Sequence, residues 1–419
     1  DSGLSTALIQ KKDADDLDFS SVFYFNFVIC IILYLIMFVS APFIANFYKD
    51  SSLVSIVRVI SLTLIISGVK GVQQSYVSRH MLFKRFFFST LGGTIFSAVL
   101  GIIMAYAGFG VWAIVFQQLS NNAIDTLILW ITVKWRPIKK FSWSRLKNLL
   151  SFGWKMLASS LLDTVYNNLR NMIIGKLYTS ADLAFYNQGD KFPKLIVTNI
   201  NTSIDSVLLP TMSNEQDNHV RVKDMTRRAI KISTYIMAPL MIGLAFCAKP
   251  IVQIVLTDKW LPCVPYLQIF CISYLFWPIH TANLNAIKAM GRSDLFLMLE
   301  VIKKIIGMIL LLITMNISVM AMAYSLLISG LISQVINSWP NRYLLKYSYI
   351  DQIKDILPNI VMALIMGVFV YFINYLNLSI LVSLILQIVL GGIIYLVLSI
   401  FTGNDSFRYL ITILKSRKG

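Results

Sequence analysis

The amino-acid sequence predicts an all-α polytopic membrane protein, and three observations support this class. Hydrophobic residues make up 57% of the 419 residues and charged residues only 14%, whereas soluble domains carry about 25% charged residues. Apolar windows of about 20 residues, the length that an α-helix needs to cross a bilayer, recur along the whole chain. Basic residues gather in every second loop between these windows.

The apolar windows predict about 12 transmembrane helices. The predicted spans are 22–47, 53–76, 87–107, 110–133, 150–176, 184–212, 229–255, 264–288, 295–315, 318–340, 355–375 and 379–401. The last two spans are almost uncharged, and we expect them to form an accessory hairpin that faces lipid.

The distribution of Lys and Arg predicts the orientation of these helices. Loops that precede odd-numbered spans are basic, such as 134–147 and 221–228, whereas the intervening loops contain few basic residues, with Lys49, Lys176 and Lys259 the clear examples. Because cytoplasmic loops are enriched in Lys and Arg, we expect both ends of this chain in the cytoplasm. The net charge of +17 therefore reflects topology, and we expect no nucleic-acid partner.

Short segments of the first half recur about 208 residues later, which indicates an internal repeat. Ala41–Ile44 resembles Lys249–Val252, and Gly110–Ala113 resembles Ser318–Ala321 at the start of a span. We therefore predict two pseudo-repeated six-helix lobes followed by a C-terminal helix pair. Parallel repeats with a binding site between them are typical of transporters.

The repeat also predicts the domain limits. The first lobe, 1–140, lacks the counterparts of its first two helices; the second lobe is 141–348, and the helix pair with a basic tail is 349–419. The chain begins at Asp1 without an initiator Met, so we expect a fragment of a 14-helix parent. Between the lobes, 134–147 reads as a basic linker, and we expect 142–150 to lie along the membrane interface as an amphipathic helix.

The fifth and sixth predicted spans each carry a polar stripe. The first stripe recurs at three- and four-residue spacing, which places it on one helical face: Lys155, Ser159, Asp163, Asn167, Arg170 and Asn171. The second falls within about a third of the circumference of its helix: Asp190, Lys191, Lys194, Thr198, Asn201, Thr202 and Asp205. Charged side chains inside a bilayer cost about 2.5–3.5 kcal/mol each and usually face a bundle interior or a wet cavity. Two such helices predict a polar cavity.

Motifs for covalent chemistry, cofactors and metals are missing from the sequence. It contains no GxxxxGK[ST] phosphate loop, HExxH or GxSxG motif, and its four cysteines and three histidines form no ligand cluster. We therefore predict that the protein is not an enzyme and has no cofactor and no metal site.

Several segments carry a resemblance to a known family: residues 1–13, Gly175–Tyr178, Ala184–Gln188, Val197–Asn201 and Ser206–Pro210. With these motifs the chain resembles the polysaccharide transporter (O-antigen and exopolysaccharide flippase) family of the multidrug/oligosaccharidyl-lipid/polysaccharide exporter superfamily, and in particular the lipopolysaccharide and colanic-acid exporter branch. The resemblance implies export of an oligosaccharide linked to undecaprenyl pyrophosphate across the bacterial inner membrane, by alternating access between two lobes. It implies membrane lipid, a polysaccharide polymerase and chain-length machinery as partners.

An anionic lipid-pyrophosphate and a hydroxyl-rich sugar need fixed cations and hydrogen-bonding groups in such a cavity. The candidate cavity cations are Arg170, Lys191, Lys194, Arg58 and Lys70. The candidates for hydrogen bonds to sugar or water are Asn167, Asn171, Thr198 and Asn201. Asp163, Asp190 and Asp205 either bind a coupling ion or pair with nearby cations, and the sequence leaves both roles open.

Two alternative functions remain open at this stage. A membrane O-unit polymerase or glycosyltransferase would share the hydrophobic architecture, although no loop here is long enough for an extracytoplasmic catalytic domain. A drug or lipid II exporter of the same superfamily would share the lobes, but exporters of cationic drugs usually favour acidic residues, and these stripes are basic.

Overall fold

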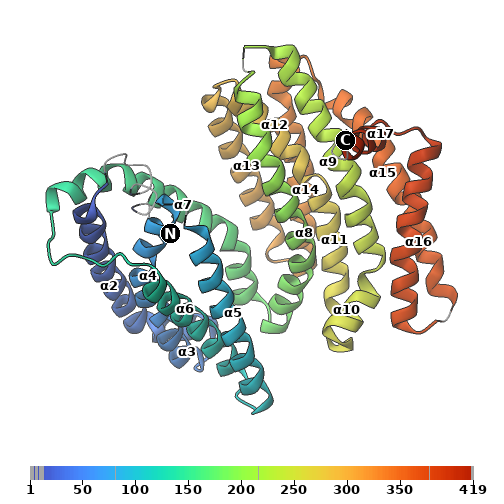
Figure 1. Cartoon of the computed structure of the whole chain (residues 1–419). Coiled ribbons are helices and arrows are strands. Elements are labelled where there is room, and N and C mark those ends of the chain that lie inside the picture. Colours follow the sequence, from blue (N-terminus) through green and yellow to red (C-terminus); the bar gives the residue numbers. More distant parts are fainter. Residues whose placement is uncertain are drawn as a thin grey trace. The chain divides into compact units, whose positions relative to one another are not determined.

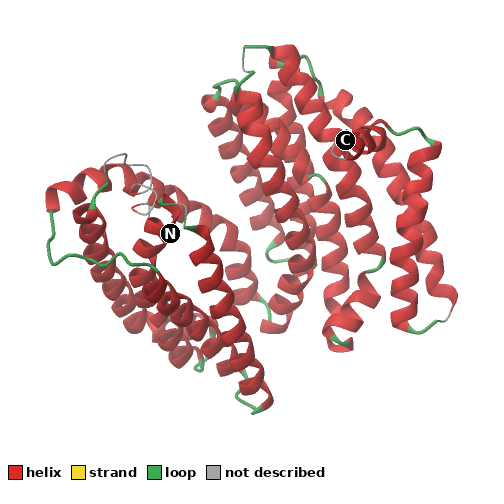
Figure 2. Ribbon diagram, viewed as in Figure 1, coloured by secondary structure: helices red, strands yellow, loops and turns green. Residues whose placement is uncertain are grey.

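The computed structural model describes Leu4, Leu8 and residues 14–80, 82–215, 217–376 and 378–416. The described residues form helices joined by short loops and contain no strand (Figures 1 and 2). The all-α fold class predicted from the sequence is confirmed. The chain separates into two compact units, Asp1–Leu169 (unit 1) and Arg170–Gly419 (unit 2).

The helices of unit 1 are α2 (Asp16–Tyr48), α3 (Leu53–Ile60), α4 (Leu62–Arg79), α5 (Phe83–Tyr106), α6 (Val111–Thr132) and the first part of α7 (Trp143–Leu177). A capping box starts α2, because Asp15 accepts a hydrogen bond from the Asp18 amide and Asp18 accepts one from the Asp15 amide. The helix ends at Lys49, whose φ of 58° is left-handed.

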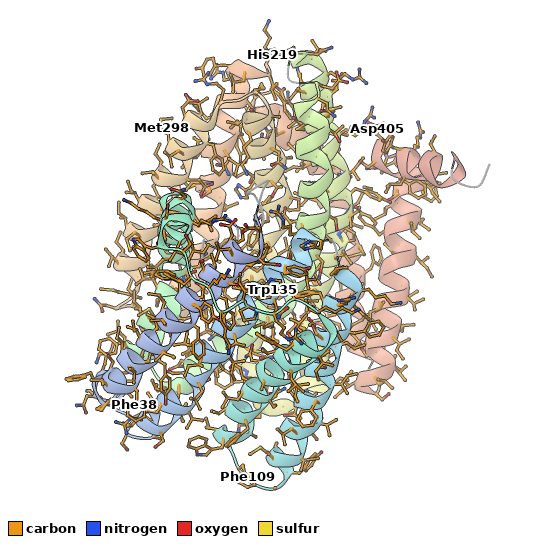
Figure 3. The ribbon with its side chains drawn as sticks, turned by 60° about the vertical axis from the view of Figure 1, so that its left-hand side comes forward. Phe38, Phe109, Trp135, His219, Met298 and Asp405 are labelled. Atoms are coloured by element: carbon orange, nitrogen blue, oxygen red, sulfur yellow. The ribbon has the colours of Figure 1, made fainter. Side chains whose placement is uncertain are left out.

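The core of unit 1 is built around Trp135, which lies among side chains at one end of the unit, whereas Phe38 and Phe109 lie toward the other end (Figure 3). Its ring packs against Phe19 and Tyr76, with centroids 5.8 and 6.0 Å apart, and its indole N–H donates to Asp16 Oδ1 at 3.1 Å. The expected linker at 134–147 therefore includes a core residue. The expected interfacial helix at 142–150 is not a separate element, because α7 continues through it without a break.

Unit 2 contains the end of α7 and the following elements: α8 (Ser180–Ser213), α9 (His219–Phe246), α10 (Ala248–Leu256), the 3-10 helix η1 (Asp258–Cys263), α11 (Val264–Leu275), α12 (Trp277–Ala289), α13 (Ser293–Thr314), α14 (Val319–Leu344), α15 (Tyr349–Phe372), η2 (Ile373–Leu376), α16 (Ile380–Phe401) and α17 (Asp405–Ser416). Helix α17 is too short to appear among the spans predicted from hydropathy. The unit boundary falls inside α7, and the domain limits proposed from the repeat stay a prediction.

Three predicted spans are interrupted in the structure. The breaks fall at Ser61 between α3 and α4, at Cys247 between α9 and α10, and at Phe276 between α11 and α12. Proline explains the last two, because Pro250 and Pro278 lack an amide hydrogen and clash with the carbonyl of the preceding turn. Ser61 instead donates its hydroxyl to the carbonyl of Val57 at 2.5 Å, a local bond that competes with the helix.

Within the described residues, eight helical segments are long and apolar enough to cross a membrane, and each coincides with a predicted span. The four other predicted spans also fall on helices of 22 to 35 residues: α6, α7, α8 and α13. The protein is thus a multi-pass membrane protein, and a count of 12 spans is compatible with its helices.

The expected C-terminal hairpin is only partly lipid-facing. Its first helix, α15, buries Met362 and Met366 in the same core as Met241 of α9, and the second helix is tied to α9 by polar contacts. The hydroxyl of Tyr395 donates to the carbonyl of Tyr235 at 2.9 Å. The pair is therefore part of the packed unit and not only an accessory to it.

A close approach between α8 and α11 makes one glycine sensitive to substitution. A Cβ atom at Gly189 would lie 2.6 Å from Tyr266 Cβ and 2.9 Å from the main-chain nitrogen of Leu267. We expect Gly189→Ala to destabilise the protein by about 1–3 kcal/mol, because the backbone of α11 would have to move. Gly392 of α16 has open space around the same position, so Gly392→Ala is the matched control. Thermal unfolding in detergent that gave equal midpoints for both variants would contradict this packing.

Candidate substrate-binding site

The guanidinium of Arg170, in the last two turns of α7, contacts α14. It donates to the carbonyl of Met322 and to the hydroxyl of Ser325, the latter at 2.9 Å. Ser325 is 1% exposed, and Arg170 is half-buried. A guanidinium carries five N–H donors in a planar fork, so two bonds to α14 leave donor capacity for a further acceptor.

The carboxylate of Asp190, on α8, links this helix to α11. It accepts a short hydrogen bond from the hydroxyl of Tyr274 and lies 3.4 Å from Lys194 Nζ, one turn along α8. Lys194 remains exposed, whereas the neighbouring Tyr186 is buried against Phe270 with ring centroids 5.1 Å apart. Tyr274 lies two residues before the α11–α12 break at Phe276, so a residue next to the break is the partner of α8.

Further along α8, Asn201 faces α12. The hydroxyl of Thr281 donates to Asn201 Oδ1 at 2.6 Å. Thr198 and Lys191 are exposed, and the carbonyl of Thr198 accepts a hydrogen bond from Thr202 at 2.8 Å. The polar stripe of α8 thus places side chains both on neighbouring helices and on an accessible surface.

The other stripe residues are only partly described. Asn171 is half-buried in unit 2, and Asn167 is exposed in unit 1. The side chains of Asp163 and Asp205 lie outside the described part of the structure.

Arg58 and Lys70, the first-lobe candidates, lie at separate places in unit 1. Arg58, on α3, stacks over the ring of Phe38 at 4.2 Å and donates to the Phe38 carbonyl at 3.3 Å. Lys70, on α4, lies 2.5 Å from a carboxylate oxygen of Asp125 on α6, and both side chains are largely buried, at 15% and 5% exposure. The structure therefore does not bring these two cations together.

Several partners in this region were missed by sequence reasoning. Ser325, Tyr274, Thr281 and Asp125 each pair with a predicted residue across a large sequence separation, from 55 to 155 residues. Asp125 is a charged residue in a predicted span, which is a signal that could have singled it out. The hydroxyl residues carry no such signal, because Ser, Thr and Tyr are common in membrane helices.

We define the candidate site as the polar residues of unit 2 that α7 and α8 present: Arg170, Asn171, Asp190, Lys191, Lys194, Thr198 and Asn201. The packing of α8 against α11, α12 and α14 positions the residues of α8, and hydrogen bonds to α14 position Arg170. Cationic, amide and hydroxyl donors suit phosphate and sugar oxygens. Charged side chains inside a membrane protein cost free energy, so they usually mark a functional site.

Comparison with known proteins places the chain among proteins of polysaccharide synthesis. It is 28% identical over 302 residues to the teichuronic acid biosynthesis protein TuaB of Bacillus subtilis (strain 168), an alignment that covers 70% of this chain and 62% of TuaB. It is 22% identical over 310 residues to the lipopolysaccharide biosynthesis protein WzxC of Escherichia coli (strain K12), which covers 72% of this chain and 62% of WzxC. The aligned part spans about three fifths of each relative's length.

The fold is similar to that of a solved structure, the lipid II flippase MurJ in an inward closed conformation. The TM-score is 0.77 at 19% sequence identity, with 98% of this chain and 88% of the MurJ chain covered. This likeness concerns the fold. The model of a family described as polysaccharide biosynthesis proteins matches residues 1–265, more than half of the chain, in agreement with the resemblance predicted from the motifs. The chain therefore belongs to the polysaccharide biosynthesis protein family.

Proposed function

We propose that this protein flips an oligosaccharide linked to undecaprenyl pyrophosphate across the bacterial cytoplasmic membrane. The transported unit would be an O-antigen or exopolysaccharide repeat, and transport would proceed by alternating access without covalent chemistry. In this proposal the lobes 1–140 and 141–348 move against each other, both ends of the chain are cytoplasmic, and a polymerase with its chain-length machinery receives the exported unit.

The observation that carries the proposal is the cluster of cationic and polar side chains that α7 and α8 present in unit 2. Arg170 bonded to α14 and Asp190 bonded to Tyr274 lie on helices whose neighbours are long and apolar. The unaided head group would have to lose the hydration of its pyrophosphate and of every sugar hydroxyl over about 30 Å of hydrocarbon. Fixed cations and amide groups in a hydrated groove lower that cost, while the prenyl tail stays in lipid.

The residues divide into three proposed roles. Arg170, Lys191 and Lys194, with Arg58 and Lys70 in the first lobe, would attract the pyrophosphate. The hydrogen bonds to sugar or water would come from Asn167, Asn171, Thr198 and Asn201. The carboxylates Asp163, Asp190 and Asp205 would bind a coupling ion or hold the cations in place.

The experiment that tests the proposal is deletion of the full-length gene, followed by analysis of the lipid-linked oligosaccharide in each leaflet. We expect units of normal length to accumulate in the cytoplasmic leaflet. Units that reach the outer leaflet but stay unpolymerised would assign a polymerase instead. Normal surface polysaccharide with changed resistance to lipophilic cations would assign a drug exporter.

A further inference from the structure

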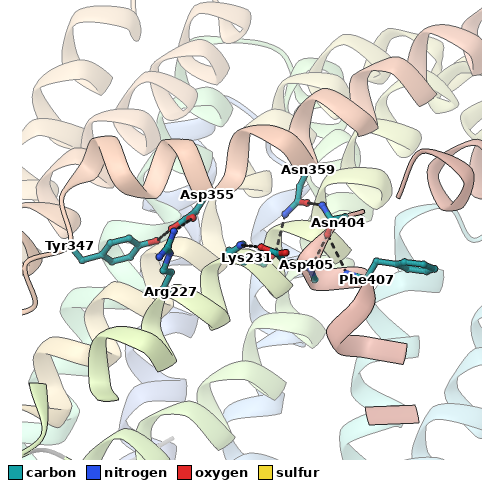
Figure 4. A network of polar contacts seen from close by, with 9 residues as sticks. Arg227, Lys231, Tyr347, Asp355, Asn359, Asn404, Asp405 and Phe407 are labelled. Atoms are coloured by element: carbon teal, nitrogen blue, oxygen red, sulfur yellow. Dashed lines mark hydrogen bonds and ion pairs between the residues drawn. The ribbon is translucent and has the colours of Figure 1, made fainter. Parts of the chain in front are cut away.

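The start of α17 and the preceding Asn404 are fixed to the interior of α9 and of α15 (Figures 1 and 4). Lys231 Nζ lies 2.7 Å from Asp405 Oδ2, and the side-chain amide of Asn404 donates to Asn359 Oδ1 at 2.9 Å. The ammonium group of Lys231 lowers the pKa of Asp405 below its usual range, so this carboxylate is charged at neutral pH. Helix α17 is therefore held in place by polar bonds and not only by apolar packing.

A second ion pair lies beside this attachment (Figure 4). Arg227 donates to both carboxylate oxygens of Asp355, at 2.7 and 2.8 Å, and the hydroxyl of Tyr347 donates to the same carboxylate at 2.8 Å. Arg227 is therefore paired with Asp355, as Lys231 is with Asp405.

Between α9 and α17 lies a pocket of about 380 Å³, a volume within the range of small-molecule sites. Its lining residues are Asp224, Arg227, Arg228, Lys231, Ile232, Asp405, Ser406 and Tyr409. Among the described side chains, Asp224 and Arg228 form no ion pair, although they are four residues apart on α9 and could reach each other. One cation and one acid thus remain available in the same pocket.

The position of Arg228 keeps its donors accessible. Its guanidinium lies over the ring of Tyr409, with 4.8 Å between the guanidinium carbon and the ring centroid. The side chain of Arg228 is exposed, and a guanidinium carries five N–H donors, so donors remain for a ligand. The same cation–π contact occupies the ring of Tyr409, so this ring is not free to bind a second cation.

An apolar surface that suits acyl chains lies on the helix that precedes α17. The last turns of α16, directly before α17, expose Val397, Ile400 and Phe401 at 41%, 64% and 84%. Since α16 is one of the membrane-crossing segments, these side chains face lipid. The pocket residue Asp405 follows Phe401 by four residues, so a headgroup in the pocket would lie near this apolar surface.

We propose that the pocket between α9 and α17 binds the headgroup of an amine-bearing zwitterionic phospholipid, with the phosphate at Arg228 and the ammonium at Asp224. The two opposite charges match the two ends of such a headgroup. An acidic phospholipid would leave Asp224 without a partner and repel it. A quaternary ammonium has no N–H to donate to the carboxylate. The site is distinct from the polar residues of α7 and α8 and does not depend on what the protein transports.

The test is lipid binding to the full chain purified in detergent, with phosphatidylethanolamine, phosphatidylcholine and phosphatidylglycerol of identical acyl chains. Native mass spectrometry measures the fraction of protein that carries one lipid. We expect phosphatidylethanolamine to bind about tenfold more tightly than either other lipid, the value of one charged hydrogen bond. Soluble O-phosphoethanolamine lacks acyl chains, so it should compete for the site at least about tenfold less effectively than phosphatidylethanolamine.

Two variants and a control locate the site. Asp224→Asn and Arg228→Gln should each remove the preference for phosphatidylethanolamine, whereas Arg292→Gln, an exposed arginine paired with Asp294 outside the pocket, should keep it. Size-exclusion profiles of the variants, compared with that of the parent protein, check that the variants are folded. Equal binding of all three lipids, or a preference that survives both variants, would overturn the proposal. Stronger binding of phosphatidylglycerol would indicate a site for acidic lipids. Competition by O-phosphoethanolamine as effective as that by phosphatidylethanolamine would indicate a soluble ligand. Either result would also overturn the proposal.

Discussion

Replacing Arg170 by alanine in the full-length protein is expected to lower polysaccharide export roughly 10- to 100-fold. The change removes the donors that hold α7 to the Met322 carbonyl and the Ser325 hydroxyl. It also removes the cation that we assign to the substrate pyrophosphate. The measurement is surface polysaccharide per cell, normalised to the amount of protein in the membrane.

Two companion variants separate the roles of this side chain. Arg170→Lys keeps the charge but loses the planar fork, so a partial recovery of export would indicate charge recognition. Ser325→Ala removes one acceptor and leaves the cation in place, so it should reduce export much less. Unchanged export by the Arg170→Ala variant would exclude Arg170 from the site, and Arg292→Ala serves as the control for a surface arginine.

Replacing Asp125 by asparagine is expected to destabilise the protein by about 3–5 kcal/mol, because it leaves Lys70 charged, largely buried and without its carboxylate. Unfolding by heat or denaturant in detergent measures the loss. A loss of less than about 1 kcal/mol in the free energy of unfolding would mean that Lys70 reaches water or another partner. That result would contradict the buried Lys70–Asp125 pair.

The double variant Lys70→Met/Asp125→Leu is the control for this pair. Because apolar residues of similar size can replace a buried ion pair, we expect stability close to that of the parent. Export by this variant then tests the proposed role of Lys70 separately from folding. A stable double variant that exports normally would remove Lys70 from the list of substrate cations.

Much of the fold follows from hydropathy, because every predicted span coincides with a helix or with two consecutive helices. The interruptions were harder to foresee. Pro250 and Pro278 mark two of them in the sequence, but a proline in a membrane span only kinks the helix in many proteins. Ser61 marks the third by a local hydrogen bond that no composition rule predicts. Helix α17 is short and amphipathic, so windows of membrane-spanning length do not detect it.

The candidate site was predictable only where its contacts are local. The Lys194–Asp190 pair follows from four-residue spacing on one helix. The partners of Arg170 and Lys70 depend on which helices become neighbours, and that is decided by packing over many residues.

The contact between Arg170 and Met322 has a genetic consequence. The acceptor is a main-chain oxygen, which every amino acid supplies, so side-chain replacement at position 322 leaves this bond intact as long as α14 keeps its course. Position 325 contributes through its side chain, and only a small hydroxyl residue can keep that bond. Suppressor mutations that compensate for weakened hydrogen bonds between Arg170 and α14 should therefore appear at position 325 or on the packing surface of α14. No particular side chain at position 322 should act as a suppressor.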